Sequence, residues 1–266
     1  FRLQKIVKLI RILNHFSLPD FYETFLINNH NFVISDYYEF NFDETVKKIH
    51  QDKNLDTNKK LKLLESISLQ VINSIIYLHE NKIVHRDLKP SNLMINKSGQ
   101  IKLIDLDFAK KLHNEEIKIS MPIGTTFYKA PELILGQNDY SYSQDIWSLG
   151  CIIAEIYLGV PLFESKNEIE TLFLIKDFSE RTNSVGDFQK LFKINADLLN
   201  FNTISSNLSF DRNLNEIENT IKDFIVDCLS LDPSQRFDHT KKENFIFIKN
   251  LENIEFKIIS NYINIE

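Results

Sequence analysis

The sequence is poor in cysteine. Only Cys151 and Cys228 occur among the 266 residues, and each of them lies within an apolar stretch. Two buried, reduced thiols are therefore expected, rather than a disulfide or a metal site built on cysteine. This use of cysteine indicates an intracellular protein of the cytoplasm or the nucleus.

An excess of positive charge is also absent, since 31 Lys and Arg residues stand against 37 Asp and Glu residues and the net charge is −6. Nucleic acids and anionic membranes bind clustered Lys and Arg, so no broad surface of that kind is expected. An uninterrupted apolar run of about 18 residues, which a spanning helix needs, is missing too. The best candidate, residues 151–163, is broken by Glu155 and Pro161. Neither a nucleic acid nor a membrane is expected as a partner.

The 43% of hydrophobic residues suffice for a sizeable core, and their spacing predicts strands first and helices later. Helical spacing is clear in residues 2–14, 57–81 and 143–159, and weaker in residues 167–178, 216–230 and 241–249. Strands are predicted for residues 22–27 and 31–38, a hairpin for residues 92–96 and 100–106, and loops with short helices for residues 179–215. The predicted class is α+β, with a small strand-rich lobe joined near residues 36–41 to a larger helical lobe.

Five short motifs follow one another along the chain: HRDLKPSN (85–92), DLD (105–107), APE (130–132), DIWSLG (145–150) and DPSQR (232–236). Together they resemble the signature of eukaryotic protein kinases, and the CMGC group with its cyclin-dependent-kinase-like members in particular. The resemblance covers roughly residues 8 to 250. It implies a two-lobed kinase-like fold. Residues 1–36 would be the remnant of the first lobe, residues 37–250 the second lobe with the hinge, and residues 251–266 a C-terminal extension.

The resemblance implies a serine/threonine kinase that transfers the γ-phosphate of ATP, with Mg²⁺, to protein hydroxyls. Asp87 would accept the proton of the substrate hydroxyl, and Lys89 would lie near the γ-phosphate. Asn92 and Asp105 would supply oxygen ligands to Mg²⁺, and Thr125 would brace Asp87 and Lys89. A lone Asp or Asn in a loop is usually a turn residue, but the shared motif outweighs that reading here.

The nucleotide would bind beneath the sequence VISDYY, residues 33–38. The resemblance places the adenine against the backbone around Asp36 and Tyr38. Ser35 occupies the gatekeeper position, where a small residue should open a back pocket. Met94 would also contact the bound nucleotide.

Structural and regulatory roles are implied for further residues. His85 would pack the catalytic loop, Asp145 would bind its backbone amides, and Glu132 would pair with Arg236. Ser120 would be the phosphorylated residue of the activation segment, clamped by three basic residues, which are Arg86, Lys110 and Lys5. For a lone loop serine, a solvated side chain without a role is the alternative.

Three positions depart from the family pattern. Lys129 replaces the arginine before APE, so the pocket that selects proline lacks its bidentate side chain. Ile6 stands where the regulatory helix carries its ion-pairing glutamate, and Asp107 stands where the family has glycine. The Gly-rich loop and the strand lysine that hold the nucleotide would lie before Phe1, so we expect the printed sequence to begin within the regulatory helix.

These departures leave a second hypothesis open, a pseudokinase that uses the fold as a binding scaffold. The intact Asp87, Lys89, Asn92 and Asp105 favour the kinase. The expected partners are proteins that present Ser or Thr, and whether proline follows that residue is left open. A cyclin-like activator is also left open against a monomeric kinase, because residues 1–8 do not resemble the usual cyclin-binding motif.

Overall fold

The computed structural model describes residues 13–28, 30–112, 117–118, 126–137, 139–182, 211–240, 248 and 254–264. The chain divides by its internal contacts into two compact units. The first unit contains the described residues up to His85, from Lys89 to Lys111 and after Asn250; the second contains Arg86–Leu88 and the described residues from Leu112 to Lys249. This division does not follow the predicted domain boundaries, which stay a prediction from the resemblance.

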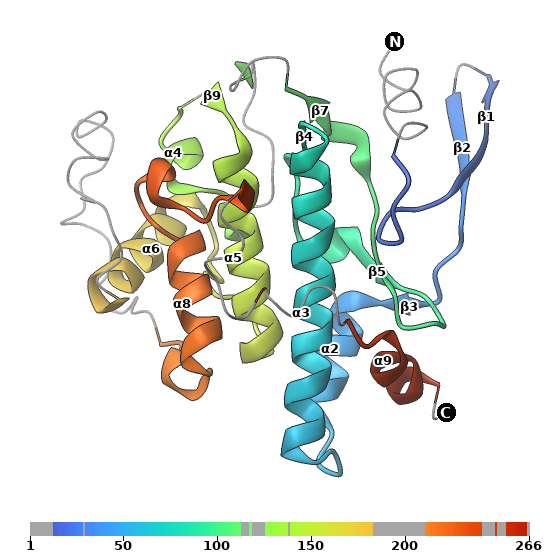
Figure 1. Cartoon of the computed structure of the whole chain (residues 1–266). Coiled ribbons are helices and arrows are strands. Elements are labelled where there is room, and N and C mark those ends of the chain that lie inside the picture. The colour runs from blue at the N-terminus through green and yellow to red at the C-terminus, as the bar shows by residue number, and fades with distance from the viewer. Residues whose placement is uncertain are drawn as a thin grey trace. The chain divides into compact units, whose positions relative to one another are not determined.

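The described residues contain both strands and helices, in agreement with the predicted α+β class (Figure 1). The strands are β1 (Phe21–Ile27), β2 (His30–Ser35), β3 (Phe40–Asn41), β4 (Ile83–Val84), β5 (Leu93–Ile95), β6 (Ile101–Leu103), β7 (Lys110–Lys111), β8 (Ile117–Lys118) and β9 (Asp139–Tyr140). The helices are α2 (Phe42–Gln51), α3 (Thr57–Glu80), α4 (Pro131–Ile134), α5 (Tyr142–Leu158), α6 (Glu168–Thr182), α8 (Asn219–Cys228) and α9 (Phe256–Ile263). Single turns of 3₁₀ helix occupy Pro90–Asn92, Leu106–Phe108, Thr126–Tyr128, Leu214–Glu216 and Pro233–Gln235.

The described residues of the first unit form three small antiparallel sheets. Strands β1 and β2 form a hairpin, β5 lies between β3 and β6, and β4 pairs with β7. The hairpin β1–β2 exposes large apolar side chains, and Phe25 stacks on Phe32 across it with ring centroids 5.3 Å apart. In the sheet of β3, β5 and β6, Met94 faces both Asn41 and Lys102. Of the predicted nucleotide and metal residues, Met94 lies in this sheet, Asn92 directly precedes β5, and Asp105 follows β6.

Helix α3 is the central helix of the first unit. Its N-terminus is capped by the Asp56 carboxylate, which accepts hydrogen bonds from the amides of Asn58 and Lys59. Its buried Gln70 side chain joins the helix to the β5–β6 hairpin, donating to the Gly99 carbonyl at 3.0 Å and accepting from the Ile101 amide at 2.7 Å. By length and apolar composition α3 could cross a membrane, although no such segment was expected, and 72% of its most apolar stretch is buried inside the protein.

The C-terminal helix α9 packs against α3 (Figure 1). Gly99, in the turn between β5 and β6, has φ of +78° and lies so close to α9 that an added Cβ would collide with the Phe256 carbonyl oxygen. Nearby, the Ser66 hydroxyl donates to the Glu255 carbonyl at 3.2 Å. A glycine at this turn therefore lets the final helix approach the hairpin closely.

Helix α5 is the buried centre of the second unit, as its continuous apolar sequence predicts. A capping box at Ser141 and Gln144 begins the helix, and Gly159 ends it in the left-handed conformation. Helix α8 packs beside α5 (Figure 1). At this contact Gly150 faces Cys228 so closely that an added Cβ would lie 2.7 Å from the Cys228 Cβ atom. Cys151 and Cys228 are both buried free thiols, as predicted.

Several elements differ from the prediction. Helix α2 and the final helix α9 are present although neither was predicted, because α2 has few apolar residues and α9 is short. Helix α6 runs to Thr182, into the predicted loop region. Strand β2 ends at Ser35, three residues before the predicted end, and beyond it the Tyr38 hydroxyl donates to the Asp36 carboxylate at 3.4 Å. The predicted helices at residues 2–14 and 241–249 lie outside the described residues, except for Leu13, Asn14 and Ile248.

Candidate active site

Arg86 and Asp87 belong to the second unit, where the buried carboxylate of Asp145 holds their backbone. Arg86 has a φ of +75°, a conformation that non-glycine residues adopt at an energetic cost. Its amide donates to Asp145 Oδ1 at 2.9 Å, and the Tyr140 hydroxyl donates to the same oxygen at 2.9 Å. The predicted hydrogen bond from Asp145 to the catalytic loop is therefore present. Asp87 follows directly and is only 6% exposed.

Tyr140 contacts Arg86 a second time. The guanidinium carbon of Arg86 lies 5.7 Å from the centroid of the Tyr140 ring, within the range of a cation–π interaction. Burial, and then the charge of Asp145, raise the pKa of the Tyr140 hydroxyl, which therefore stays a donor to Asp145. Nothing in the sequence pattern singled out Tyr140. It lies five residues before Asp145, on the short strand β9.

Asn92 and Asp105 lie at the same end of the paired strands β5 and β6 in the first unit. The Asn92 carbonyl accepts a hydrogen bond from the Ile104 amide at 2.8 Å, and Leu93 faces Leu103 in the next step of the ladder. Asn92 is 4% exposed, whereas Asp105 is an exposed residue with φ of +57°. The backbone amide of Asp107 donates to Asp105 Oδ1 at 3.3 Å.

These two residues fit a Mg²⁺ ion by their chemistry. Mg²⁺ binds oxygen ligands and is often held by one or two protein carboxylates together with waters and substrate phosphates. An amide oxygen and a carboxylate at one end of a hairpin meet that requirement. No group of three or more His, Cys, Asp and Glu side chains that could hold a metal by themselves occurs in the described part of the chain.

Residues 36–39, which connect β2 to β3, are called the hinge segment from here on. The Asp36 carboxylate accepts hydrogen bonds from the Tyr22 hydroxyl, from the Asp20 amide at 3.3 Å and from the Tyr38 hydroxyl at 3.4 Å. The bond from Tyr22 lowers the pKa of Asp36. Tyr38 is buried, whereas the side chain of Ser35, at the predicted gatekeeper position, is exposed and donates to the Asp36 carbonyl at 3.4 Å.

Glu132 and Arg236 form the predicted ion pair in the second unit, and both side chains are 1% exposed. His85 is fully buried in the first unit, and its Nε2 lies 3.4 Å from the Ile104 carbonyl oxygen. Lys129 is also buried, and its ammonium lies 2.6 Å from Glu168 Oε1 at the start of α6. Sequence reasoning did not foresee that partner, since 39 residues separate the two.

The remaining predicted residues are less informative. Lys89 is partly exposed, Met94 is partly exposed on β5, and Lys110 is exposed on β7. Thr125, Ser120, Lys5 and Ile6 lie outside the described residues. Their predicted roles stay predictions.

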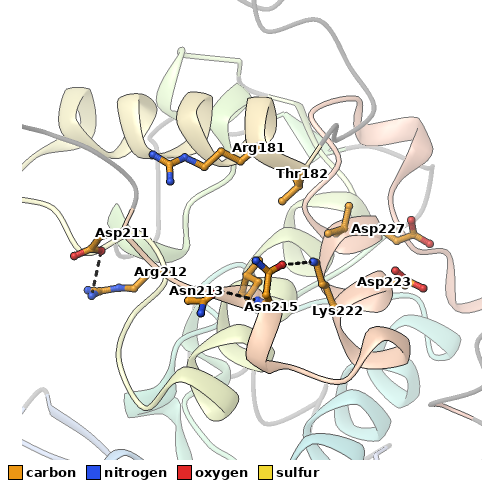
Figure 2. Close-up of a pocket in the computed structure, with 11 residues that line it drawn as sticks. Arg181, Thr182, Asp211, Arg212, Asn213, Asn215, Lys222, Asp223 and Asp227 are labelled. Carbon is orange, nitrogen blue, oxygen red and sulfur yellow. Dashed lines mark hydrogen bonds and ion pairs between the residues drawn. The ribbon is translucent and has the colours of Figure 1, made fainter.

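A cavity of about 510 Å³ lies elsewhere in the second unit, where the end of α6 meets α8 (Figure 2). Two of its cations have partners: Arg212 lies 3.4 Å from Asp211, and Lys222 donates to Asn215 at 2.9 Å. None of the predicted site residues that the structure describes lines it. Its place and balanced charge give no reason to assign it to phosphoryl transfer.

Comparison with known proteins agrees with the site. The family model for the protein kinase domain matches residues 2–246. The chain is 31% identical over 176 residues to the curated protein "Cyclin-dependent kinase-like 2" of Pongo abelii, a match that covers 65% of this chain and 35% of that protein. The chain therefore spans about a third of the length of that relative.

A solved structure is similar in fold. The crystal structure of the yeast RNA Pol II CTD kinase CTDK-1 complex matches 90% of this chain and 79% of its own chain, with a TM-score of 0.72 and 22% sequence identity. At this identity the likeness bears on the fold alone. It agrees with the two-lobed α+β fold predicted from the five motifs.

Proposed function

Because the chain belongs to the protein kinase family, we propose that it is a cyclin-dependent-kinase-like serine/threonine kinase, which transfers the γ-phosphate of ATP to Ser or Thr of proteins. One observation carries the proposal: the backbone hydrogen bond between Asn92 and Ile104 sets an amide side chain and the Asp105 carboxylate at one end of the β5–β6 hairpin. Phosphoryl transfer needs such oxygen ligands, because its catalysis consists mainly of positioning and neutralisation of charge.

Each residue has a distinct part in this proposal. Asn92 and Asp105 would hold Mg²⁺, which neutralises charge on the phosphates of ATP. Asp87 would orient the substrate hydroxyl and accept its proton, and Lys89 would place a positive charge near the transferred group. The hydrogen bond from Arg86 to Asp145 supports this assignment, because it fixes the backbone directly before Asp87.

The adenine would lie against the hinge segment and above Met94. The donors and acceptors that it needs would be backbone groups of Asp36 and Tyr38. The Asp36 carboxylate accepts hydrogen bonds from the hydroxyls of Tyr38 and Tyr22, which favours a fixed backbone in the absence of the nucleotide. Similarity to a cyclin-dependent kinase-like protein supports a protein substrate. Neither a proline after the phosphorylated residue nor a cyclin-like activator is part of this proposal.

Asp107 favours the second hypothesis, a scaffold without catalytic activity. Its carboxylate adds a negative charge beside the proposed metal ligand, and its amide binds Asp105 Oδ1. A scaffold would bind nucleotide weakly or not at all and would transfer no phosphate. The two hypotheses therefore differ in a single measurement.

The experiment uses the full-length protein with radiolabelled Mg·ATP and a mixture of protein substrates. Phosphate should be incorporated by the wild type, and Asp87→Asn should lower the rate by about 10² or more, since the proton acceptor is removed. Asp211→Asn, an exposed aspartate in the second unit, is the matched control and should retain the wild-type rate. Incorporation by Asp87→Asn at the wild-type rate would show that the transfer does not use this site.

A binding measurement separates a scaffold from a kinase. Asp105→Asn should abolish the dependence of nucleotide affinity on Mg²⁺, because it removes the anionic ligand. Nucleotide binding without any transfer by the wild type, under conditions where a known kinase is active, would favour the scaffold.

A further inference from the structure

Lys102 is a buried lysine in the middle of strand β6, between two fully buried apolar residues. It is 6% exposed, and its neighbours Ile101 and Leu103 are fully buried. A lysine without a partner in such a place would be costly. Its ammonium donates to the carbonyl oxygen of Leu18 at 3.1 Å and lies 5.9 Å from the centroid of the Tyr38 ring.

The charges around Lys102 come from the approach to β1 and from the hinge segment. Burial lowers the pKa of the ammonium, while the carboxylates of Asp20 and Asp36 act in the opposite direction. Asp36 is joined to Asp20 by two hydrogen bonds, one from each backbone amide: the Asp36 amide donates to the Asp20 carbonyl at 3.2 Å, and the Asp20 amide donates to the Asp36 carboxylate. Lys102 therefore faces one connected group of residues that includes both ends of the β1–β2 hairpin.

The strand register places Lys102 next to the proposed nucleotide site. Lys102 and Met94 are direct partners in the antiparallel pair of β5 and β6, so their side chains lie on the same face of the sheet. Met94 is the residue proposed to lie beneath the adenine. Lys102 thus lies beside that residue in the sheet and contacts the hinge segment through Tyr38.

We propose that Lys102 is a positioning residue for the nucleotide: its buried ammonium, bound to Leu18 and packed on Tyr38, holds the hinge segment where adenine is received. This inference rests on the proposed function, because it takes the hinge segment as the adenine site. Lys102 itself touches no reacting group. Its effect reaches the nucleotide through Tyr38 and the electrostatic attraction of Asp36.

A lysine that only stabilised the fold would give a different result. Its loss would lower the melting temperature and would leave the affinity of the folded fraction for ATP unchanged. A positioning lysine changes the hinge segment in the folded protein. The two roles are therefore distinguished by the KM for ATP and by hydrogen exchange at the hinge amides of the nucleotide-free protein.

The variants are Lys102→Met, which keeps the length of the side chain and removes the charge, and Lys102→Arg, which restores a buried cation. Lys53→Met is the control, since Lys53 is an exposed lysine of the same unit, in the turn between α2 and α3. Lys102→Met should raise the KM for ATP about tenfold with kcat nearly unchanged. Lys102→Arg should recover most of that loss, and Lys53→Met should behave as the wild type.

Hydrogen exchange tests the inference without catalysis. In nucleotide-free Lys102→Met the amides of residues 36–38 should exchange about tenfold faster, while the amides of α3 keep their wild-type rates. If Lys102→Met does not fold, Lys102→Gln takes its place, because it keeps a donor for the Leu18 carbonyl without the charge. An unchanged KM together with unchanged exchange at residues 36–38 in either folded variant overturns the inference.

The outcome also separates this inference from the proposed function. A wild-type protein that neither binds ATP nor transfers phosphate contradicts the proposed function. Hydrogen exchange at residues 36–38 of Lys102→Met then tests the role of Lys102 independently of catalysis. Faster exchange than in the wild type supports the inference that Lys102 holds the hinge segment, and unchanged exchange overturns it.

Discussion

The guanidinium of Arg236 binds both carboxylate oxygens of Glu132, with Nη1 and Nη2 each 2.7 Å from their acceptors. Arg236 also donates to the Ser230 carbonyl at 2.8 Å, and its guanidinium carbon lies 5.0 Å from the centroid of the Trp147 ring. Gln144 supplies a further donor to Glu132 at 2.9 Å. This buried pair joins α4 to the turn after α8 and orders the middle of the second unit.

Arg236→Ala should destabilise the protein by about 3–5 kcal/mol, because it leaves the Glu132 carboxylate buried without its cation. The measurement is the free energy of unfolding by urea. Arg181→Ala is the control, since Arg181 pairs with Asp177 at 2.9 Å on the exposed surface of α6, where solvent screens the two charges, and its loss should change the stability little. Equal losses of unfolding free energy in the two variants would show that burial does not determine how much the Glu132–Arg236 pair contributes to stability. If Arg236→Ala does not fold, Arg236→Lys should give an intermediate loss.

The close contact of Gly99 with helix α9 leads to a prediction about how this final helix is held. The φ of +78° at Gly99 disfavours any other residue, and an added Cβ would meet the Phe256 carbonyl and lie 2.6 Å from the Ser260 nitrogen. Gly136 has a similar φ of +83° but open space around it. Gly136→Ala should therefore cost only the backbone strain of about 1–2 kcal/mol, whereas Gly99→Ala should cost more and speed amide exchange in α9. Exchange in α9 that stays at the wild-type rate would contradict this contact.

The sequence predicts the elements whose apolar spacing is long and regular. Helices α3 and α5 and the β5–β6 hairpin are such elements, and all three are present close to their predicted bounds. The family resemblance also implies the pairing of Glu132 with Arg236, although 104 residues separate them. In these cases the local sequence pattern and the tertiary packing favour the same structure, so the sequence is sufficient to predict it.

Other contacts have no local pattern. Lys129 and Glu168 meet only because α6 folds back on the residues before α4, and Tyr140 reaches Asp145 through a strand of two residues. A signal for Lys102 did exist: a lysine between two apolar residues of a buried strand requires a buried partner. Its partner, the backbone carbonyl of Leu18, could not be named, because carbonyls are the same at every position of the sequence.

His15 predicts a dependence of stability on pH. Its ring stacks on Tyr77 with centroids 4.3 Å apart, and burial, followed by the charge of Lys102, lowers its pKa. The folded protein therefore binds this proton less readily than the unfolded chain does. The contribution of neutral His15 to stability should be fully present above the unfolded pKa of about 6.5. It should be lost progressively as the pH decreases below that value.

The measurement is the melting temperature of the full-length protein at about pH 7.5 and about pH 5.5, on either side of that value. His15→Phe keeps an aromatic ring on Tyr77 without a titrating group. Its melting temperature should therefore fall less than that of the wild type between the two pH values. His30→Phe, at an exposed histidine of β2, is the control and should show the wild-type decrease. A decrease in His15→Phe as large as in the wild type would exclude His15 as its source.

Lys129 leads to a prediction about substrates that rests on the proposed kinase activity. The family resemblance places an arginine here, which organises the pocket for a proline after the phosphorylated residue. The Lys129 ammonium is instead buried and lies 2.6 Å from Glu168 Oε1, and an ammonium is a single point of charge. An arginine could bind Glu168 with one N–H group and still offer the others to neighbouring carbonyls.

Lys129→Arg should therefore increase the preference for proline about fivefold, measured as kcat/KM for a Ser-Pro peptide divided by kcat/KM for the matching Ser-Ala peptide. Glu168→Gln in the wild-type background is the companion variant. It removes the negative charge of the acceptor while Lys129 remains, and a lone ammonium cannot supply the fork that an arginine provides, so the ratio should stay low. A ratio for Lys129→Arg equal to that of the wild type, in a variant with an unchanged melting temperature, would show that this side chain does not set the choice of the following residue.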